Sequence, residues 1–132
     1  MDSHDIQAAL KNVPELRITE ATTEADAMAA MRVITSFNQC MVGMVRFAGE
    51  TPWERHPDDE LLHVLQGEVD VTVLTDAAVV ETTVRAGAIF IVPKGLWHRQ
   101  KPRPTVALLF ATSMEGNETS TADDPRSTSA VS

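Results

Sequence analysis

The sequence has few of the features that mark secreted, membrane or nucleic-acid-binding proteins. It contains one cysteine, Cys40, in 132 residues, which excludes an internal disulfide and favours a reducing compartment. It has 11 basic and 19 acidic residues, which give a formal charge of -8. This negative charge argues against a nucleic-acid or anionic membrane partner. No apolar run approaches the ~20 residues of a membrane span. Because Met1–Leu10 also lacks a signal-peptide layout, a cytoplasmic location is expected.

A length of 132 residues with 43% hydrophobic residues fits one packed domain. Three regions are predicted within it: a partly helical N-terminal extension over 1–40, a strand-rich barrel over 41–112, and a polar tail over 113–132. The tail is mostly Ser, Thr, Asp, Glu and Asn and has too little apolar surface to offset its ordering entropy. We expect it to be flexible, or to dock as an arm on a partner subunit.

The N-terminal extension begins with a stretch, residues 5–22, that shows no sustained period and is predicted to be loosely structured. Thr23 is a good N-cap and is followed by acidic residues and helix formers. A short helix from Glu24 to about Arg32 is therefore predicted, with an outer strand over Met28–Ile34 as the alternative.

Short apolar segments separated by turn residues follow Asn38 and indicate an all-β sandwich or barrel. In Glu68–Val73 the apolar and polar residues alternate strictly, which predicts a strand with one buried face. Breaks such as Gly67 read as turns between antiparallel neighbours. The predicted strands are Met41–Phe47, Leu61–Leu65, Val69–Leu74, Val79–Arg85, Ala88–Val92 and Val106–Ala111.

Candidate metal ligands gather in two short segments of this region. Glu54 and His56 lie two apart on an extended segment, so their side chains point the same way, roughly 6 to 7 Å apart. Pro57-Asp58-Asp59 predicts a turn that brings Glu60 opposite His56. His63 has the wrong strand parity, and His98 is the only histidine after it that could complete a site. Two imidazoles with a carboxylate are typical of open non-haem iron sites.

These residues carry a resemblance to the cupin superfamily. Its first motif is Gly, five residues, His-x-His, three or four residues, Glu, six residues, Gly; its second is Gly-x5-Pro-x-Gly-x2-His-x3-Asn. The first is matched, with four residues after the first Gly, by Gly49, His56, Glu60 and Gly67. The second is matched by Gly87, Pro93, Gly95 and His98, with Pro102 at the last position. Glu54 stands where the first motif has a His.

The resemblance implies a small antiparallel, jelly-roll-like β-barrel, commonly a homodimer, that binds one divalent metal ion. Its ligands would be His56, Glu60, His98 and Glu54. The additional carboxylate favours iron or manganese over zinc or nickel. Glu54 could instead act as a general base, or pair with Arg55 or Arg99 and leave three ligands. The absence of tyrosine, with Leu62 two residues after the motif Glu, argues against the cupin lyases.

Two functions fit this pattern. The first is a metal-dependent enzyme for a small organic substrate, most naturally an oxygenase (dioxygenase), with isomerase or decarboxylase chemistry next. The second is a non-catalytic module that binds a sugar or organic acid, with or without metal. Trp53 and Trp97 are expected to pack or to form a dimer interface. The walls of an apolar pocket are expected from Leu62, Leu65, Ile89, Phe90, Ile91, Leu108 and Phe110.

Overall fold

Two long antiparallel strands, β5 (Glu60–Leu74) and β8 (His98–Ser113), form the centre of the fold in this computed structural model, which describes residues 1–126. The other edge of β5 pairs with β7 (Ile89–Val92) and then β6 (Val79–Arg85). The other edge of β8 pairs with β3 and β4. The remaining bounds are α1 (Ile6–Leu10), β1 (Glu15–Arg17), α2 (Glu24–Ala30), β2 (Arg32–Phe37), β3 (Cys40–Ala48), β4 (Trp53–Arg55) and β9 (Glu118–Ser120).

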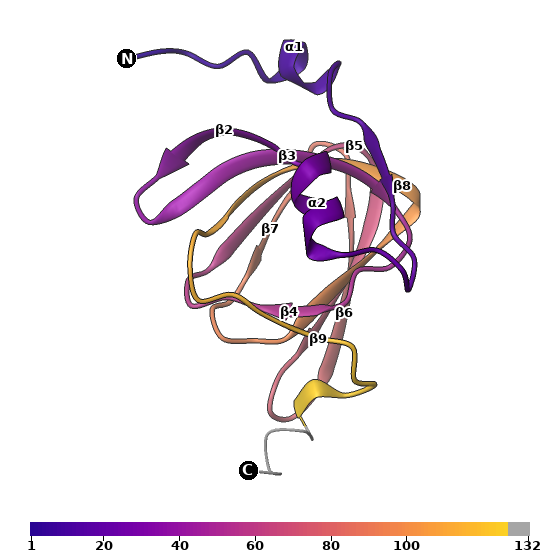
Figure 1. The fold of residues 1–132 in the computed structure, drawn as a ribbon. Helices are drawn as coiled ribbons and strands as arrows, with labels where there is room; N and C mark the ends of the chain where they lie inside the picture. The colour runs from indigo at the N-terminus through magenta and orange to yellow at the C-terminus, as the bar shows by residue number, and fades with distance from the viewer. Residues whose placement is uncertain (127–132) are drawn as a thin grey trace.

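The nine strands of residues 1–126 form one sheet that curls around a hydrophobic interior (Figure 1). Its pairings do not close into a ring within these residues, because β6 and β7 pair with β5 alone and β9 pairs with β4 alone. Neighbours are antiparallel except for β1, which runs parallel to β3. The expected all-β fold is confirmed, as an open jelly-roll-like barrel.

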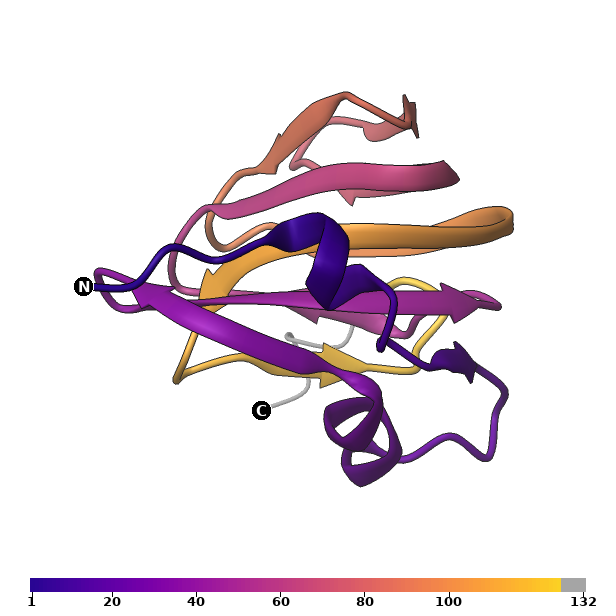
Figure 2. The same ribbon diagram turned by 90° about the horizontal axis from the view of Figure 1, so that it is seen from above.

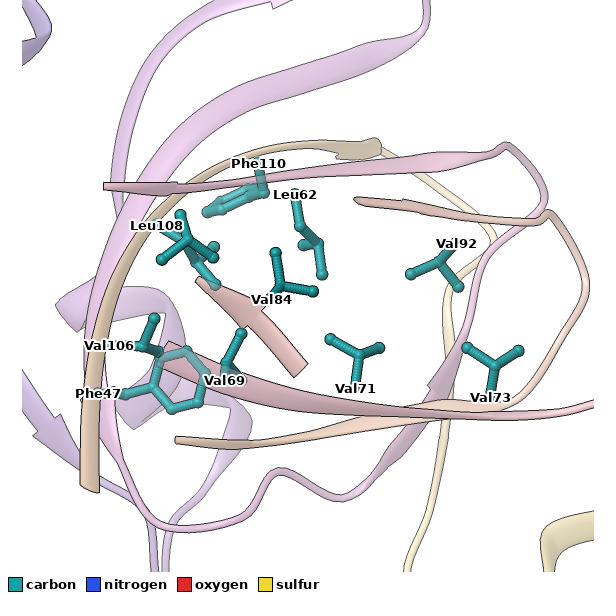
Figure 3. Packing of buried hydrophobic residues seen from close by; sticks show 11 residues of the cluster. Phe47, Leu62, Val69, Val71, Val73, Val84, Val92, Val106, Leu108 and Phe110 are labelled. Carbon is teal, nitrogen blue, oxygen red and sulfur yellow. The ribbon is translucent and has the colours of Figure 1, made fainter. Parts of the chain in front are cut away.

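Alternation along the strands builds the interior. Leu62 and Val64 of β5 and Leu108 and Phe110 of β8 are all at most 4% exposed. Figure 3 shows this cluster enclosed by the strands. The cluster consists of Phe47, Leu62, Val64, Val69, Val71, Val73, Val84, Val92, Val106, Leu108 and Phe110. Burial of these apolar side chains is the main source of the fold's stability.

Three of the residues expected to line the pocket lie elsewhere. Ile89 and Ile91 are 62% and 45% exposed, because strand parity turns Phe90 and Val92 of β7 toward the interior instead. Leu65 packs in a second cluster beneath α1. These three expectations were wrong because the phase of each strand could not be fixed from short apolar runs.

Gly67 interrupts pairing without ending the strand. The sequence predicts a turn there between two strands, but Glu60–Leu74 is continuous and its register against β8 shifts on both sides of Gly67. Gly67 has a φ of +78°, and a Cβ at this position would lie 2.3 Å from the Thr105 carbonyl oxygen. A bulge here keeps both halves of β5 facing inward.

The N-terminal extension is more ordered than its composition predicts. Thr23 and Asp26 form a capping box that starts α2, as the sequence indicates. The helix ends at Ala30 and is followed by β2. In the stretch predicted to be loosely structured, Leu10 and Val13 at and after α1 are buried against β3 and β8. Figure 2 shows α1 lying outside the sheet.

The segment after β8 also differs from the expected flexible tail. Glu118–Ser120 forms β9 and pairs with Trp53–Arg55 of β4. The last part of the predicted tail, 127–132, lies outside the described residues. Neither described helix has the length and apolar character to cross a membrane.

Candidate metal centre

Local pairing brings the four candidate ligands together at one end of the barrel. Glu54 of β4 lies directly opposite His98 of β8, so both side chains share a face. His56 lies two residues after Glu54. Glu60 begins β5 after the turn at Pro57–Asp59 and is 5% exposed. The structure thus unites all four side chains that the sequence analysis selected.

The potential donor atoms lie at distances suited to one ion. His98 Nε2 is 3.1 Å from Glu60 Oε1, and His56 Nε2 is 3.6 Å from Glu60 Oε2 and 3.8 Å from Glu54 Oε2. Glu54, His56 and His98 each offer a ligand atom within 4.8 Å of the other two. Ligand atoms about 2.1 Å from one ion are about 3 to 3.4 Å apart at octahedral or tetrahedral angles. Small side-chain shifts would therefore suffice to bind a metal.

Hydrogen bonds on the far side of each imidazole fix which nitrogen faces the cluster. His56 Nδ1 lies 2.8 Å from Asn117 Oδ1, and His98 Nδ1 lies 3.3 Å from the Leu96 carbonyl oxygen. Both partners are acceptors, so each Nδ1 carries a hydrogen and donates it. In the neutral rings both Nε2 lone pairs then point at the carboxylates, which is the arrangement of metal-ligating histidines.

The buried Nε2 of His56 has no hydrogen-bond partner of its own. It faces the carboxylates of Glu54 and Glu60 and neighbours the His98 ring, whose centroid is 5.1 Å from that of His56. A cluster of facing acceptors is stable only when a bound cation or an added proton lies between them. The donor set therefore fits a divalent metal ion.

The electrostatics of the cluster also favour a positive charge between the carboxylates. Burial opposes ionisation of Glu60, but the neighbouring His56 and His98 imidazoles lower the pKa of Glu60 to about 2. Burial likewise opposes charging of His56, but Glu60, Asn117 and Glu54 raise the pKa of His56 to about 9. Burial, and then the charge of Glu60, raise the pKa of Glu54. Without a metal, a proton on His56 compensates the carboxylates.

The loops that carry the ligands are tied to one another. Ser113 Oγ accepts the Asp58 amide hydrogen at 3.1 Å and donates to Asp58 Oδ2 at 2.7 Å. Asp59 Oδ1 accepts the Lys94 amide hydrogen at 2.8 Å. The Gly95 amide donates to the His56 carbonyl at 2.8 Å. These bonds fix the turn between His56 and Glu60 against the loop before His98.

Arg55 and Arg99 are occupied away from Glu54. Arg55 lies over the Trp97 ring at 4.5 Å and pairs with Glu118 at 2.6 Å. Arg99 lies over the Trp53 ring at 4.2 Å and pairs with Glu50 at 3.5 Å. The alternative in which Glu54 pairs with one of these arginines is therefore wrong.

Two polar residues near the centre were missed by sequence reasoning. Asn117 comes from the segment predicted to be a flexible tail, and only the preceding glycine hinted at an ordered turn. Gln100 is 8% exposed on the same strand face as His98, and its Oε1 has no hydrogen-bond partner. Alternation from His98 could have identified Gln100 as an inward-facing polar group.

Comparison with known proteins also reveals similarity to cupin domains. The Cupin domain family model matches residues 43–103. The uncharacterized protein YdbB of Bacillus subtilis is 40% identical over 70 residues, which are 52% of this chain and 58% of that protein. The match thus spans little more than half of that relative.

Similar solved structures have the same architecture. A cupin-2 domain protein of Shewanella frigidimarina has a TM-score of 0.55 at 23% identity, over 70% of this chain and 94% of that one. Protein NMB1881 of Neisseria meningitidis has a TM-score of 0.62 at 19% identity, over 85% and 99%. An oxalate oxidase has a TM-score of 0.54 at 26% identity, over 62% and 46%. In its two spaced motifs, its match to the Cupin domain model and its open β-barrel, this chain is similar to the cupin superfamily.

Proposed function

We propose that this protein is a metal-dependent cupin enzyme in which Glu54, His56, Glu60 and His98 bind one divalent ion. The observation that carries the proposal is the buried, unpartnered Nε2 of His56, which faces two carboxylates beside a second imidazole. Each imidazole is already oriented by a hydrogen bond from its other nitrogen. Such outer contacts accompany histidine ligands in metalloproteins.

The ligand set favours iron or manganese. Two carboxylates and two imidazoles form a harder set than imidazole alone, and they balance the charge of a divalent ion. Zinc and nickel remain the competing ions. A bound iron or manganese ion would supply Lewis acidity or redox capacity, and the fold would supply shape, polarity and exclusion of water.

Glu54 is the ligand best placed to meet a substrate. Its side chain is 35% exposed, against 7% for Glu60 and 1% for His98. A carboxylate that is partly open to a bound substrate can accept a proton from it. We assign it a second role as the general base when it is released from the metal.

The substrate is proposed to be a small oxygenated organic acid. Gln100 and Thr112 each place a buried oxygen without a partner in the barrel wall, where it can bind a polar substrate group. The similarity to an oxalate oxidase, 26% identical over 62% of this chain, favours oxygenase-type or oxidase-type chemistry over isomerisation or decarboxylation. The single thiol is compatible with work in the cytoplasm.

The second candidate is a non-catalytic module that binds a sugar or organic acid. The unpartnered buried oxygens of Gln100 and Thr112 favour this candidate equally, because they can bind such a ligand without a reaction.

Metal analysis separates the two candidates. Protein purified without chelator should contain near-stoichiometric iron or manganese, and His98→Ala should lose it. His63→Ala is the matched control, since His63 lies on β5 outside the cluster. Dioxygen uptake with a panel of small carboxylic acids should follow the metal content. Absence of metal from the wild type, with unchanged stability in chelator, would favour the binding module.

We further propose that the protein is a homodimer. Leu61 and Ile91 are cross-strand partners on the outer face of β5 and β7, and Ile89 lies beside them. Ile89 and Ile91 are 62% and 45% exposed. Contiguous exposed apolar residues on a sheet face can form the self-complementary patch that a two-fold dimer requires.

A further inference from the structure

The segment Gly116–Ser120 is attached to the strand that carries Glu54. Its strand β9 pairs Ser120 with Trp53, Thr119 with Glu54 and Glu118 with Arg55. On its other edge β4 pairs with β8 only at Glu54–His98. The C-terminal segment therefore supplies most of the backbone pairing of β4.

Asn117 lies directly before this strand and contacts the His56 ring. Asn117 Oδ1 is 2.8 Å from His56 Nδ1, and Asn117 Nδ2 donates to the Ser113 carbonyl oxygen at 2.8 Å. A carbonyl oxygen can only accept, so the Ser113 contact directs the amide nitrogen away from the ring and Oδ1 toward it. The amide orientation thus places the hydrogen on Nδ1 and leaves Nε2 facing Glu54 and Glu60.

The backbone does not fix this ring by itself. The Gly95 amide bonds the His56 carbonyl, which positions the main chain but leaves the ring torsion free. Torsions of this type have broad minima. Within residues 1–126, Asn117 is the hydrogen-bond partner on the Nδ1 side that can hold the imidazole plane.

Gly116 lets Asn117 reach this position. Its φ is +81°, and a Cβ there would lie 3.2 Å from Pro57 Cγ. Pro57 directly follows His56, so the chain reverses against the turn that joins two candidate ligands. A side chain at 116 would strain the backbone and push the segment away from that turn.

We propose that Asn117 is a positioning residue of the metal centre, so that the C-terminal segment completes the site on the barrel. The inference rests on the proposed function, because it assigns Asn117 the role of the outer partner of a metal-ligating histidine. Removing such partners typically lowers metal affinity about 10- to 100-fold.

The experiment compares the Mn²⁺ affinity of the full chain with that of Asn117→Ala, Asn117→Asp and Glu118→Ala. Asn117→Ala should raise the Kd by about 10-fold or more. Asn117→Asp keeps the acceptor for Nδ1 but turns a carboxylate oxygen toward the Ser113 carbonyl, so its Kd should rise clearly less than that of Asn117→Ala. Glu118→Ala removes the Arg55 ion pair on the same segment but leaves the imidazole contact, so its affinity should be unchanged.

A spectroscopic measurement separates ring orientation from general loosening. In the Zn²⁺-loaded wild type and Asn117→Asp, the His56 Nδ1 hydrogen should exchange slowly and give a resolved proton NMR signal. The signal should be lost in Asn117→Ala. Equal affinity of Asn117→Ala and wild type, or equal losses in Asn117→Ala and Asn117→Asp, would overturn the positioning role alone. A wild type that binds neither Mn²⁺ nor Zn²⁺ would overturn the proposed function and this inference together.

Discussion

At the scale of single residues, Glu54 sets the charge of the proposed metal centre. It stands where the first motif has a histidine, opposite His98 across β4 and β8. A carboxylate here adds a second negative charge to that of Glu60 and replaces a nitrogen donor with oxygen. Oxygen donors favour manganese and iron, whereas imidazole suits zinc and nickel as well.

Glu54→His should therefore shift the metal preference toward zinc and nickel. We expect the ratio of Mn²⁺ to Zn²⁺ affinity to fall by about tenfold or more, in line with the preference of imidazole for later metals. Competition with a chromophoric chelator measures both affinities. Glu50→His is the control, because Glu50 pairs with Arg99 outside the cluster. An unchanged ratio in Glu54→His would show that Glu54 is not a ligand.

Residue-level prediction was most successful where spacing and strand parity acted together. Motif spacing predicts His56, Glu60 and His98 as ligands. In the structure the Glu60 carboxylate lies 3.6 Å from His56 Nε2 and 3.1 Å from His98 Nε2. Asn117 lies 61 residues from His56, in a polar stretch with no apolar period. The local sequence of that stretch does not show that one edge of β4 is free to pair with it. The pairing of β9 with β4 could therefore not be predicted.

At the scale of elements, the register shifts in β5 allow one strand to serve two halves of the barrel. Glu60, Leu62 and Val64 face inward before Gly67, and Val69 and Val71 face inward after it. An odd number of steps separates Val64 from Val69, so uninterrupted alternation would turn one half outward. The irregularity at Gly67 corrects the phase.

Gly67→Ala should accordingly be strongly destabilising. Its Cβ would lie 2.3 Å from the Thr105 carbonyl oxygen at a φ of +78°, and the combined strain should cost about 2 to 5 kcal/mol of unfolding free energy. Gly87→Ala is the matched control, with a φ of +92° and nothing within 4 Å of the added Cβ. Its loss should be about 1 to 2 kcal/mol. Urea unfolding of metal-free protein gives both values, and equal losses would contradict the close contact at Gly67.

Element types were predictable where local signals were strong. The cap at Thr23 marks the start of α2, and the alternation over Val69–Val73 marks a half-buried strand. The turn predicted at Gly67 was wrong, because glycine is favoured both in turns and in β-bulges. Short elements such as α1 and β9 depend on tertiary contacts, so propensity alone could not reveal them.

At the scale of the whole molecule, the outer face of the sheet is covered unequally. Leu10 and Val13 pack over Met44 and Ala107, with Leu109 beside them, so the N-terminal segment protects one part of this face. Figure 2 shows α1 lying over the sheet there. The part formed by β7 and the start of β5 retains exposed isoleucines.

Ile91→Glu should therefore convert the proposed homodimer to monomer without unfolding it. Each two-fold interface contains the residue twice, so losing both buried side chains should cost about 3 kcal/mol or more and weaken association about 100-fold. Val79→Glu is the control, because Val79 is 61% exposed on β6, at the opposite end of β5 from β7. Light scattering during gel filtration should give twice the chain mass for the wild type and Val79→Glu, and the single chain mass for Ile91→Glu. A monomeric wild type, or a dimer that persists in Ile91→Glu, would show that this face is not the interface. Metal binding by the monomeric Ile91→Glu variant would show that the metal site is complete within one chain.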